Sequence, residues 1–374
     1  MHEFRFIHTS DLHLGMSFGS LPDQVRGRLV EARHETIGRL AEAAGAHGAA
    51  HVLLAGDTFD SETPSDAVRA QALAAFGAAD GLTWWLLPGN HDSLAAEALW
   101  DRLRRDAPAN LRLVDRPAPV EMDGTACLLP APLPRRFPGR DLTAWMDEVP
   151  SAEGLIRIGL AHGPIQRFGG ADDATPVIAP DRAARARLDY LALGDWHGQM
   201  RVDARCWYAG TPEKDRFRHA GRGACLAVSI AGPGAEPEVA SIDTGRFYWR
   251  EHALTLTPGI DWAVGLADTL PDAGPARRDT LMSLILEGRL GVEARRGLTA
   301  RIQAVAPEFA HLQADDTQLA TEFEAEDLDA IAPGGALRQA ADALAADAAG
   351  AGDEARIAAA ALNRLYGLLR EDAG

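Results

Sequence analysis

The sequence predicts a layered α/β domain over residues 1–256, a small α+β domain over 257–320 and a C-terminal helical segment over 321–374. Short apolar runs that alternate with amphipathic helical stretches predict the first domain. The composition agrees, because 47% hydrophobic and 24% charged residues over 374 positions are typical of a globular protein. It excludes a disordered chain, a collagen-like fibre and a small disulfide scaffold.

Five apolar runs predict the strands of the first domain, because each is short and bounded by Gly, Asp or Pro. They are FRFIH (4–8), HVLLA (51–55), WWLLP (84–88), LIRIGLA (155–161) and YLALG (190–194). Residues 22–48 repeat apolar positions every three or four residues and predict an amphipathic helix. Thr63 and Pro64 predict the cap and first turn of the next helix.

The following runs, CWYAG, ACLAVSI, EVASID and FYWREHALTL, have no helices between them and predict a second, mainly antiparallel sheet. In the small domain, a helix (260–270), a strand (280–290), a helix (292–306) and a strand (309–316) are expected. From about residue 325, two amphipathic helices joined by a Gly-containing turn are the simplest interpretation. They would either form a lid on the small domain or dock on a partner.

The net charge is −17, from 37 basic and 54 acidic residues, so the chain as a whole does not attract polyanions. Binding of nucleic acid would require a local positive centre. Cys127, Cys206 and Cys225 each lie in an apolar run and are expected to be reduced core thiols. The N-terminal residues lack the features of a signal peptide and no run is long enough to span a membrane, so a cytoplasmic protein without a membrane partner is expected.

Side chains that can bind metal follow the predicted strands, one cluster per strand. They are Asp11 and His13, Asp57 and Asp60, Asn90 and His91, His162, and Asp195 and His197. Because the carboxyl ends of strands line the ligand crevice of α/β sheets, these clusters are expected to converge. Oxygen and imidazole ligands suit Mn²⁺, Fe or Zn²⁺. A pair of such ions can clamp a phosphate and activate water.

The ordered motifs DxH, GDxxD, GNHD, a lone His and a GHxH-like element resemble those of the calcineurin-like metallophosphoesterases. The SDLHLG start and the YAGTPE segment (208–213) are similar to the nuclease subunit of the bacterial SbcCD complex and related DNA repair exonucleases. The appended α+β domain and helical tail are similar too. The resemblance implies a β-sandwich flanked by helices, with the small domain as a cap.

The resemblance also implies a role for each motif residue. It assigns Asp11, His13 and His197 to a first metal, Asp57 to a bridge, and Asn90, His162 and Asp195 to the second metal side. His91 would protonate the leaving oxygen or steady the transition state. The carboxylate of Asp60 would orient the His91 ring, since a carboxylate on one ring nitrogen fixes the tautomer.

Asp195 departs from the family pattern, which usually has His at this position. A harder, negatively charged oxygen ligand favours Mn²⁺ over Zn²⁺, so two Mn²⁺ ions are the expected cofactors, with Fe or Zn as alternatives. Two divalent ions and three carboxylates leave about +1 at the crevice floor. Arginines in two loops and one further position could extend that patch: Arg135, Arg136, Arg140, Arg167, Arg216 and Arg218.

These observations predict a two-metal-dependent phosphodiesterase that hydrolyses DNA as an exonuclease or endonuclease. The resemblance implies an SMC-like coiled-coil ATPase partner and a homodimer seam on the helices at 22–48 and 64–80, although packing on their own sheet is the simpler role. Two alternatives stay open: a small-substrate phosphoesterase on the same fold, and a non-catalytic scaffold with a structural metal site. Asp92 is expected to be only a helix cap.

Overall fold

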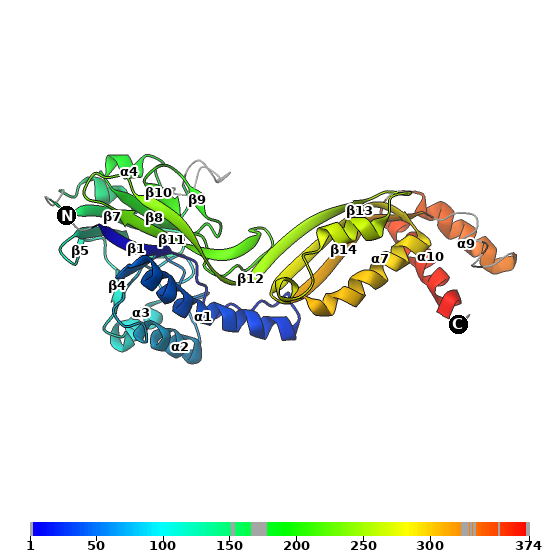
Figure 1. The fold of residues 1–374 in the computed structure, drawn as a ribbon, viewed down its shortest axis with the longest axis horizontal. Helices are drawn as coiled ribbons and strands as arrows, with labels where there is room; N and C mark the ends of the chain where they lie inside the picture. The colour runs from blue at the N-terminus through cyan, green and yellow to red at the C-terminus, as the bar shows by residue number, and fades with distance from the viewer. Residues whose placement is uncertain are drawn as a thin grey trace. The chain divides into compact units, whose positions relative to one another are not determined.

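The computed structural model describes residues 3–150, 154–165, 178–322, 329, 331, 334–350 and 352–371, with side chains up to residue 365. The chain forms two compact units, Met1–Trp249 and Arg250–Gly374. Strand β12 runs through the boundary between them (Figure 1). Each unit is described by itself.

The first unit contains two sheets. The first sheet has the order β12-β11-β1-β2-β3-β4 in this unit, and the second has the order β5-β6-β7-β8-β10-β9. The first is built from β1 (Phe4–Thr9), β2 (His51–Leu54), β3 (Thr83–Leu86), β4 (Leu111–Leu113), β11 (Gly221–Ile230) and β12 (Glu238–Leu256). The second is built from β5 (Val120–Met122), β6 (Ala126–Ala131), β7 (Ile156–His162), β8 (Tyr190–Gly194), β9 (Met200–Arg201) and β10 (Cys206–Tyr208).

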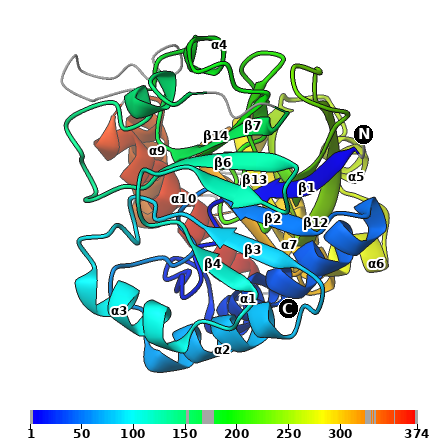
Figure 2. The same cartoon turned by 90° about the vertical axis from the view of Figure 1, so that its left-hand side faces the viewer.

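Both faces of the central strands are buried, which places the two sheets between helical layers. Along β3, Trp84 packs under the helices while its neighbour Trp85 packs between the sheets. One side of the first sheet is covered by α1 (Asp23–His47), α2 (Asp66–Gly77) and α3 (Glu97–Asp106) (Figure 2). The outer face of the second sheet packs against the segment of η1 (Ala144–Asp147) and α4 (Arg182–Arg185). The predicted α/β fold, two sheets flanked by helices, is confirmed.

All five predicted strands are present, as β1, β2, β3, β7 and β8. The prediction of a separate antiparallel sheet from the later runs is wrong. β11 pairs antiparallel with β1 and so extends the first sheet, whereas β10 pairs parallel with β8 in the second. EVASID and FYWREHALTL form the single strand β12. A run of apolar residues indicates that a strand is buried, but it does not indicate with which strands it pairs.

The two predicted helices of the first unit are also present, with one difference at a cap. The N-cap of α2 is Ser65, whose Oγ accepts a hydrogen bond from the backbone N of Val68 at 3.3 Å. Thr63 therefore does not cap this helix, and Pro64 precedes its cap rather than occupying its first turn. Cys127, Cys206 and Cys225 are free and buried, as predicted.

The second unit begins within β12 and contains the elements expected from the sequence, together with two short helical turns over 275–278 and 306–308 that the sequence did not predict. They are α5 (Trp262–Thr269), α6 (Pro275–Arg278), β13 (Thr280–Gly291), α7 (Val292–Val305), η2 (Ala306–Glu308), β14 (His311–Glu322), α9 (Gly335–Ala348) and α10 (Asp353–Glu371). β13 and β14 are parallel and α7 connects them. Leu284, Leu298 and Ile302 belong to the core of this βαβ unit. Within the described ranges, no helix has the length and apolar character needed to cross a membrane.

Candidate metal centre

The loops after β1 and β2 are joined by backbone hydrogen bonds that place their polar side chains together. The amides of Asp11 and His13 donate to the carbonyls of Gly56 and Asp57, over 3.1 and 3.0 Å. Asp11, His13 and Asp57 have φ angles of 55°, 45° and 53°. This left-handed backbone costs of the order of 1–3 kcal/mol per non-glycine residue. The hydrogen bonds between the two loops stabilise this strained backbone conformation.

Two glycines allow the motif loops to approach one another. A Cβ on Gly89 would lie 2.1 Å from Asp57 Oδ1, and one on Gly56 would lie 2.4 Å from His162 Nδ1. Both distances are far inside van der Waals contact. Only a residue without a side chain therefore fits beside Asp57 and His162.

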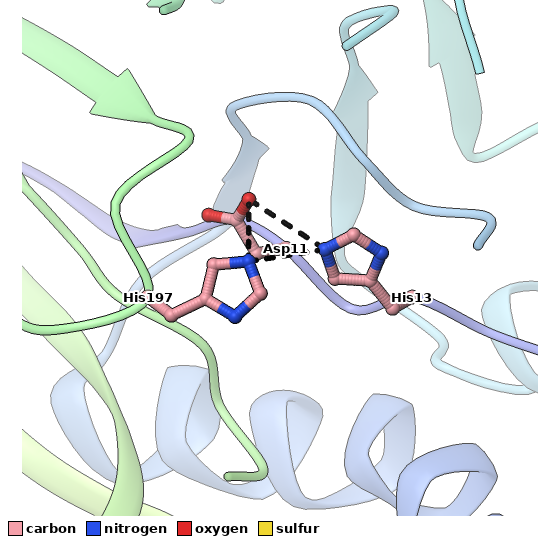
Figure 3. Close-up of side chains that lie close together, drawn as sticks. All are labelled: Asp11, His13 and His197. Carbon is pink, nitrogen blue, oxygen red and sulfur yellow. Dashed lines mark hydrogen bonds and ion pairs between the residues drawn. The ribbon is translucent and has the colours of Figure 1, made fainter. Parts of the chain in front are cut away.

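Asp11, His13 and His197 form the first group of donor atoms (Figure 3). Asp11 Oδ1 lies 3.9 Å from Nε2 of His13 and 3.8 Å from Nε2 of His197. The two Nε2 atoms are 3.3 Å apart. Asp11 Oδ1 is buried and has no hydrogen-bond partner among the described residues.

The opposite ring nitrogens explain why this group suits a cation. Nδ1 of His13 lies 3.2 Å from Asp60 Oδ1, and Nδ1 of His197 lies 2.8 Å from Asp215 Oδ2. Asp215 accepts a hydrogen bond from His197, which favours the ring proton on Nδ1. Nδ1 of His13 has no hydrogen-bond partner among the described residues, but the negative charge of Asp60 beside it favours the same tautomer. Both Nε2 lone pairs then face each other and Asp11 Oδ1. Three converging lone pairs are stabilised by a metal ion, so the residues present fit the metal that the motifs imply.

A second group surrounds His162. Its Nδ1 donates to the carbonyl of Ala55 over 2.8 Å, which leaves Nε2 as the lone pair. Nε2 lies 2.6 Å from Asn90 Oδ1, 3.4 Å from Asp57 Oδ2 and 3.8 Å from Asp195 Oδ1. Here too, oxygen and nitrogen donors converge as a cation requires.

Asp57 connects the two groups. Its Oδ2 lies 3.8 Å from His13 Nε2 and 3.4 Å from His162 Nε2. Burial opposes ionisation of Asp57, but the neighbouring His162 and His13 rings hold its pKa well below the usual range. Asp57 is therefore ionised, and its Oδ2 lies close enough to both groups to act as a ligand in either one.

Asp195 lies at the edge of the second group in an unusual backbone conformation. Its φ is 102°, and its amide donates to Asp11 Oδ2 over 3.2 Å. Burial and the nearby carboxylates of Asp11 and Asp57 raise the pKa of the Asp195 carboxyl. The chain thus places an oxygen donor where the family usually has an imidazole.

The structure brings His91 and Asp60 together. Nδ1 of His91 donates to the backbone carbonyl of Asp60 over 2.8 Å. The carboxylate of Asp60 instead lies beside His13 Nδ1. Asp60 thus holds the His91 ring through its backbone carbonyl, and its carboxylate lies in one group with nitrogens of His13 and His91, all within 4.8 Å of one another. The predicted effect of this carboxylate on His91 stays a prediction.

The prediction that Asp92 is only a helix cap is wrong. Helix α3 begins at Glu97, with Ala96 as its N-cap. Asp92 is buried and accepts from the amides of Gly89 and Phe59, over 2.7 and 3.0 Å. Burial raises the pKa of its carboxyl to about 7. Asp92 therefore links the loops that carry Asp57 and Asn90.

Asp215 was missed by the sequence reasoning. Its side chain is almost fully buried, and besides His197 it contacts Arg216, whose Nη2 lies 2.9 Å from Asp215 Oδ2. Burial opposes protonation of His197, yet the hydrogen bond to Asp215 and the charge of Asp11 raise the pKa of that ring. The only available signal was its position directly after YAGTPEK.

The predicted basic patch is partly near these donors. Arg136 and Arg140 line a cavity that also includes Asn90, His162 and Asp195. Arg216 Nη2 lies 3.4 Å from His197 Nδ1. The remaining candidates are Arg218, which stacks over Trp196 at 5.7 Å, the exposed Arg135, and Arg167, which lies outside the described residues.

Comparison with known proteins gives three findings. The sequence profile of the calcineurin-like phosphoesterases matches residues 4–199, over half of the chain. The uncharacterized metallophosphoesterase YhaO of Bacillus subtilis strain 168 is 25% identical over 228 residues, which cover 58% of this chain and 54% of that protein. The chain thus spans about half the length of this relative. The crystal structure of TT1561 of Thermus thermophilus covers 64% of this chain and 99% of its own, with 12% identity and a TM-score of 0.40.

Proposed function

The chain belongs to the calcineurin-like phosphoesterase family, and from that premise we propose that it is a two-metal-dependent phosphodiesterase that hydrolyses DNA. Membership implies a metal-dependent phosphoester hydrolase. One observation carries the proposal of two ions: Asp57 Oδ2 lies between the group of Asp11, His13 and His197 and the group around His162. The intact donor set also argues against the scaffold alternative.

The protein side chains have distinct tasks in this proposal. The bound ions supply Lewis acidity that activates water and neutralises charge on the phosphate. Asp215 fixes the ring orientation of His197 through a hydrogen bond, and the carboxylate of Asp60 lies beside the ring of His13. Because the Asp60 carbonyl accepts the Nδ1 proton of His91, Nε2 is the atom that can hold a proton for the leaving oxygen.

DNA binding by an acidic protein needs local positive charge. Arg136 and Arg140 beside the second donor group and Arg216 beside the first could contact phosphates next to the scissile one. We propose that the affinity of these arginines for DNA is modest and that an SMC-like coiled-coil ATPase supplies further contacts with DNA. A homodimer through α1 and α2 is part of the same proposal.

A second candidate function is hydrolysis of small phosphoesters such as nucleotides. The cavity beside Asn90 and His162 favours it, because its volume of about 210 Å³ admits only a small organic group. Turnover of duplex DNA, single-stranded DNA, a cyclic nucleotide and an aryl phosphate monoester by the same preparation separates the two functions.

The direct test is DNA cleavage by the purified chain with Mn²⁺ alone, in the wild type and in His91→Ala. The variant is expected to bind Mn²⁺ normally and to lose about 10²–10⁴-fold in turnover, since proton transfer contributes that much. His252→Ala, in the second unit, is the matched control and should cleave like the wild type. Wild-type turnover by His91→Ala would remove the acid role, and no cleavage of any phosphodiester by the wild type would refute the function.

Metal identity is a separate prediction. The carboxylate of Asp195 is a harder ligand than an imidazole, so the wild type should be more active with Mn²⁺ than with Zn²⁺. Asp195→His should shift that preference toward Zn²⁺. Metal-by-metal activity titration of both proteins checks this, and an unchanged preference would contradict it.

A further inference from the structure

A cavity of about 210 Å³ opens directly beside the second donor group. Asn90, His162 and Asp195 form one wall of it. Most of its other walls are apolar, from Ala131, Leu133, Ala161 and Ile178, among others. A group that enters it must therefore be attached to, or lie next to, the phosphate held at the metal centre.

The floor of this cavity is a packed part of the protein. Leu133 and Ile178 are buried, and the carbonyl of Leu133 accepts from the amide of Leu94 over 2.9 Å. Asp141 accepts from the amide and hydroxyl of Thr143, over 2.8 and 2.5 Å. Its other oxygen lies 2.7 Å from the buried guanidinium of Arg182. These bonds hold the cavity open without using the donor atoms of the metal centre.

The rim consists of an exposed loop with an aromatic residue. Phe137 lines the cavity although 74% of its surface is exposed. The guanidinium of Arg136 lies 5.7 Å from the centre of its ring. Arg140 lines the same rim. An exposed ring next to two arginines suits a planar group that carries phosphates.

We propose that this cavity binds one nucleobase, that of the nucleotide whose phosphate lies at the metal centre. The inference rests on the proposed phosphodiesterase function and specifies its substrate. The volume is smaller than the roughly 300–1,000 Å³ of a complete ligand site, so it accommodates one part of a substrate. The apolar walls take the faces of the base, Phe137 stacks on it, and the arginines contact adjacent phosphates. The substrate is then a strand end whose base is unstacked, as in single-stranded or frayed DNA.

The test compares two single-stranded oligonucleotides with Mn²⁺ and the full chain. One is unmodified, and in the other the bases flanking the scissile phosphate are replaced by abasic residues. Because the abasic strand has no base to stack on Phe137, we expect its KM to rise about 10-fold, with kcat nearly unchanged. Phe137→Ala should raise KM similarly on the unmodified strand and have little effect on the abasic one, while Phe137→Trp should keep the wild-type KM.

Tyr248→Ala is the matched control, since Tyr248 is an exposed aromatic residue of the same unit outside this cavity. It should leave both KM values unchanged. Equal KM values for the two strands in the wild type would overturn the base site while the phosphodiesterase function stands. Equal effects of Phe137→Ala on both strands would assign Phe137 to loop structure and also overturn the proposed stacking. Cleavage of neither strand would overturn both the function and this inference.

Discussion

An acidic residue holds His197 at its outer ring nitrogen, while its inner nitrogen faces Asp11. Asp11 Oδ1 lies 3.8 Å from Nε2, and Asp215 Oδ2 lies 2.8 Å from Nδ1. A carboxylate at the outer nitrogen fixes the tautomer and raises the basicity of the nitrogen that binds metal. Asp215 is thus a positioning residue for His197, although it donates no atom to the metal centre itself.

Asp215→Asn should weaken Mn²⁺ binding about 10–100-fold, which is typical for loss of such a partner. The reason is that an amide oxygen is a weaker acceptor and leaves the ring less basic. Titration calorimetry with Mn²⁺ measures the effect. Asp203→Asn is the matched control, because Asp203 is an exposed turn residue that caps the amide of Arg205. Equal affinity in wild type and Asp215→Asn would contradict the role.

The sequence allowed individual candidate metal ligands to be predicted where they directly follow a strand. Asp11, Asp57 and Asn90 could be predicted to converge, because each lies just after an apolar run. The contacts of Asp92 and Asp215 could not. Each depends on which loops meet in space, and no local pattern in the sequence records that pairing.

At the scale of elements, the ends of the strands determine the site. β1, β2 and β3 are parallel neighbours in one sheet, and β7 and β8 are parallel neighbours in the other. The loops that follow these strands come together at the metal centre. Gly56 leaves room for His162 there, and Gly89 leaves room for Asp57. Strand identity was predictable from hydrophobic runs, whereas the assignment of β10 and β11 to different sheets required long-range pairing that the sequence does not display.

Gly89→Ala should displace Asp57, since its Cβ would lie 2.1 Å from Asp57 Oδ1 and 2.4 Å from the backbone N of Asp57. Overpacking of this kind costs about 1–3 kcal/mol, and Mn²⁺ affinity should fall with it. Urea unfolding in the presence of a chelator measures the stability change. Gly45→Ala, inside α1 with open space around it, should instead be neutral or stabilising. A Gly89→Ala variant as stable as the wild type would disprove the steric argument.

At the scale of the molecule, the donor residues all belong to the unit Met1–Trp249. A metal that binds only the folded unit stabilises it by about 2.7 kcal/mol at a concentration 100 times its dissociation constant. Mn²⁺ should therefore raise the unfolding temperature of this unit, and a chelator should lower it.

Tryptophan fluorescence can follow that transition selectively, because every tryptophan except Trp262 lies in the first unit. Circular dichroism of the whole chain, which includes the helices of the second unit, provides the comparison. A Mn²⁺-dependent shift in the fluorescence transition is expected. The absence of any shift at saturating Mn²⁺ would contradict the metal site.

The pairing of β1 with β11 has a consequence during synthesis. Phe4 lies opposite Ile230, so the first strand emerges from the ribosome long before its partner exists. The donors are likewise spread from Asp11 to His197. Such distant contacts form late, once most of the domain has been translated. A nascent chain therefore completes its donor set only after His197, just over half-way along the sequence, has been translated.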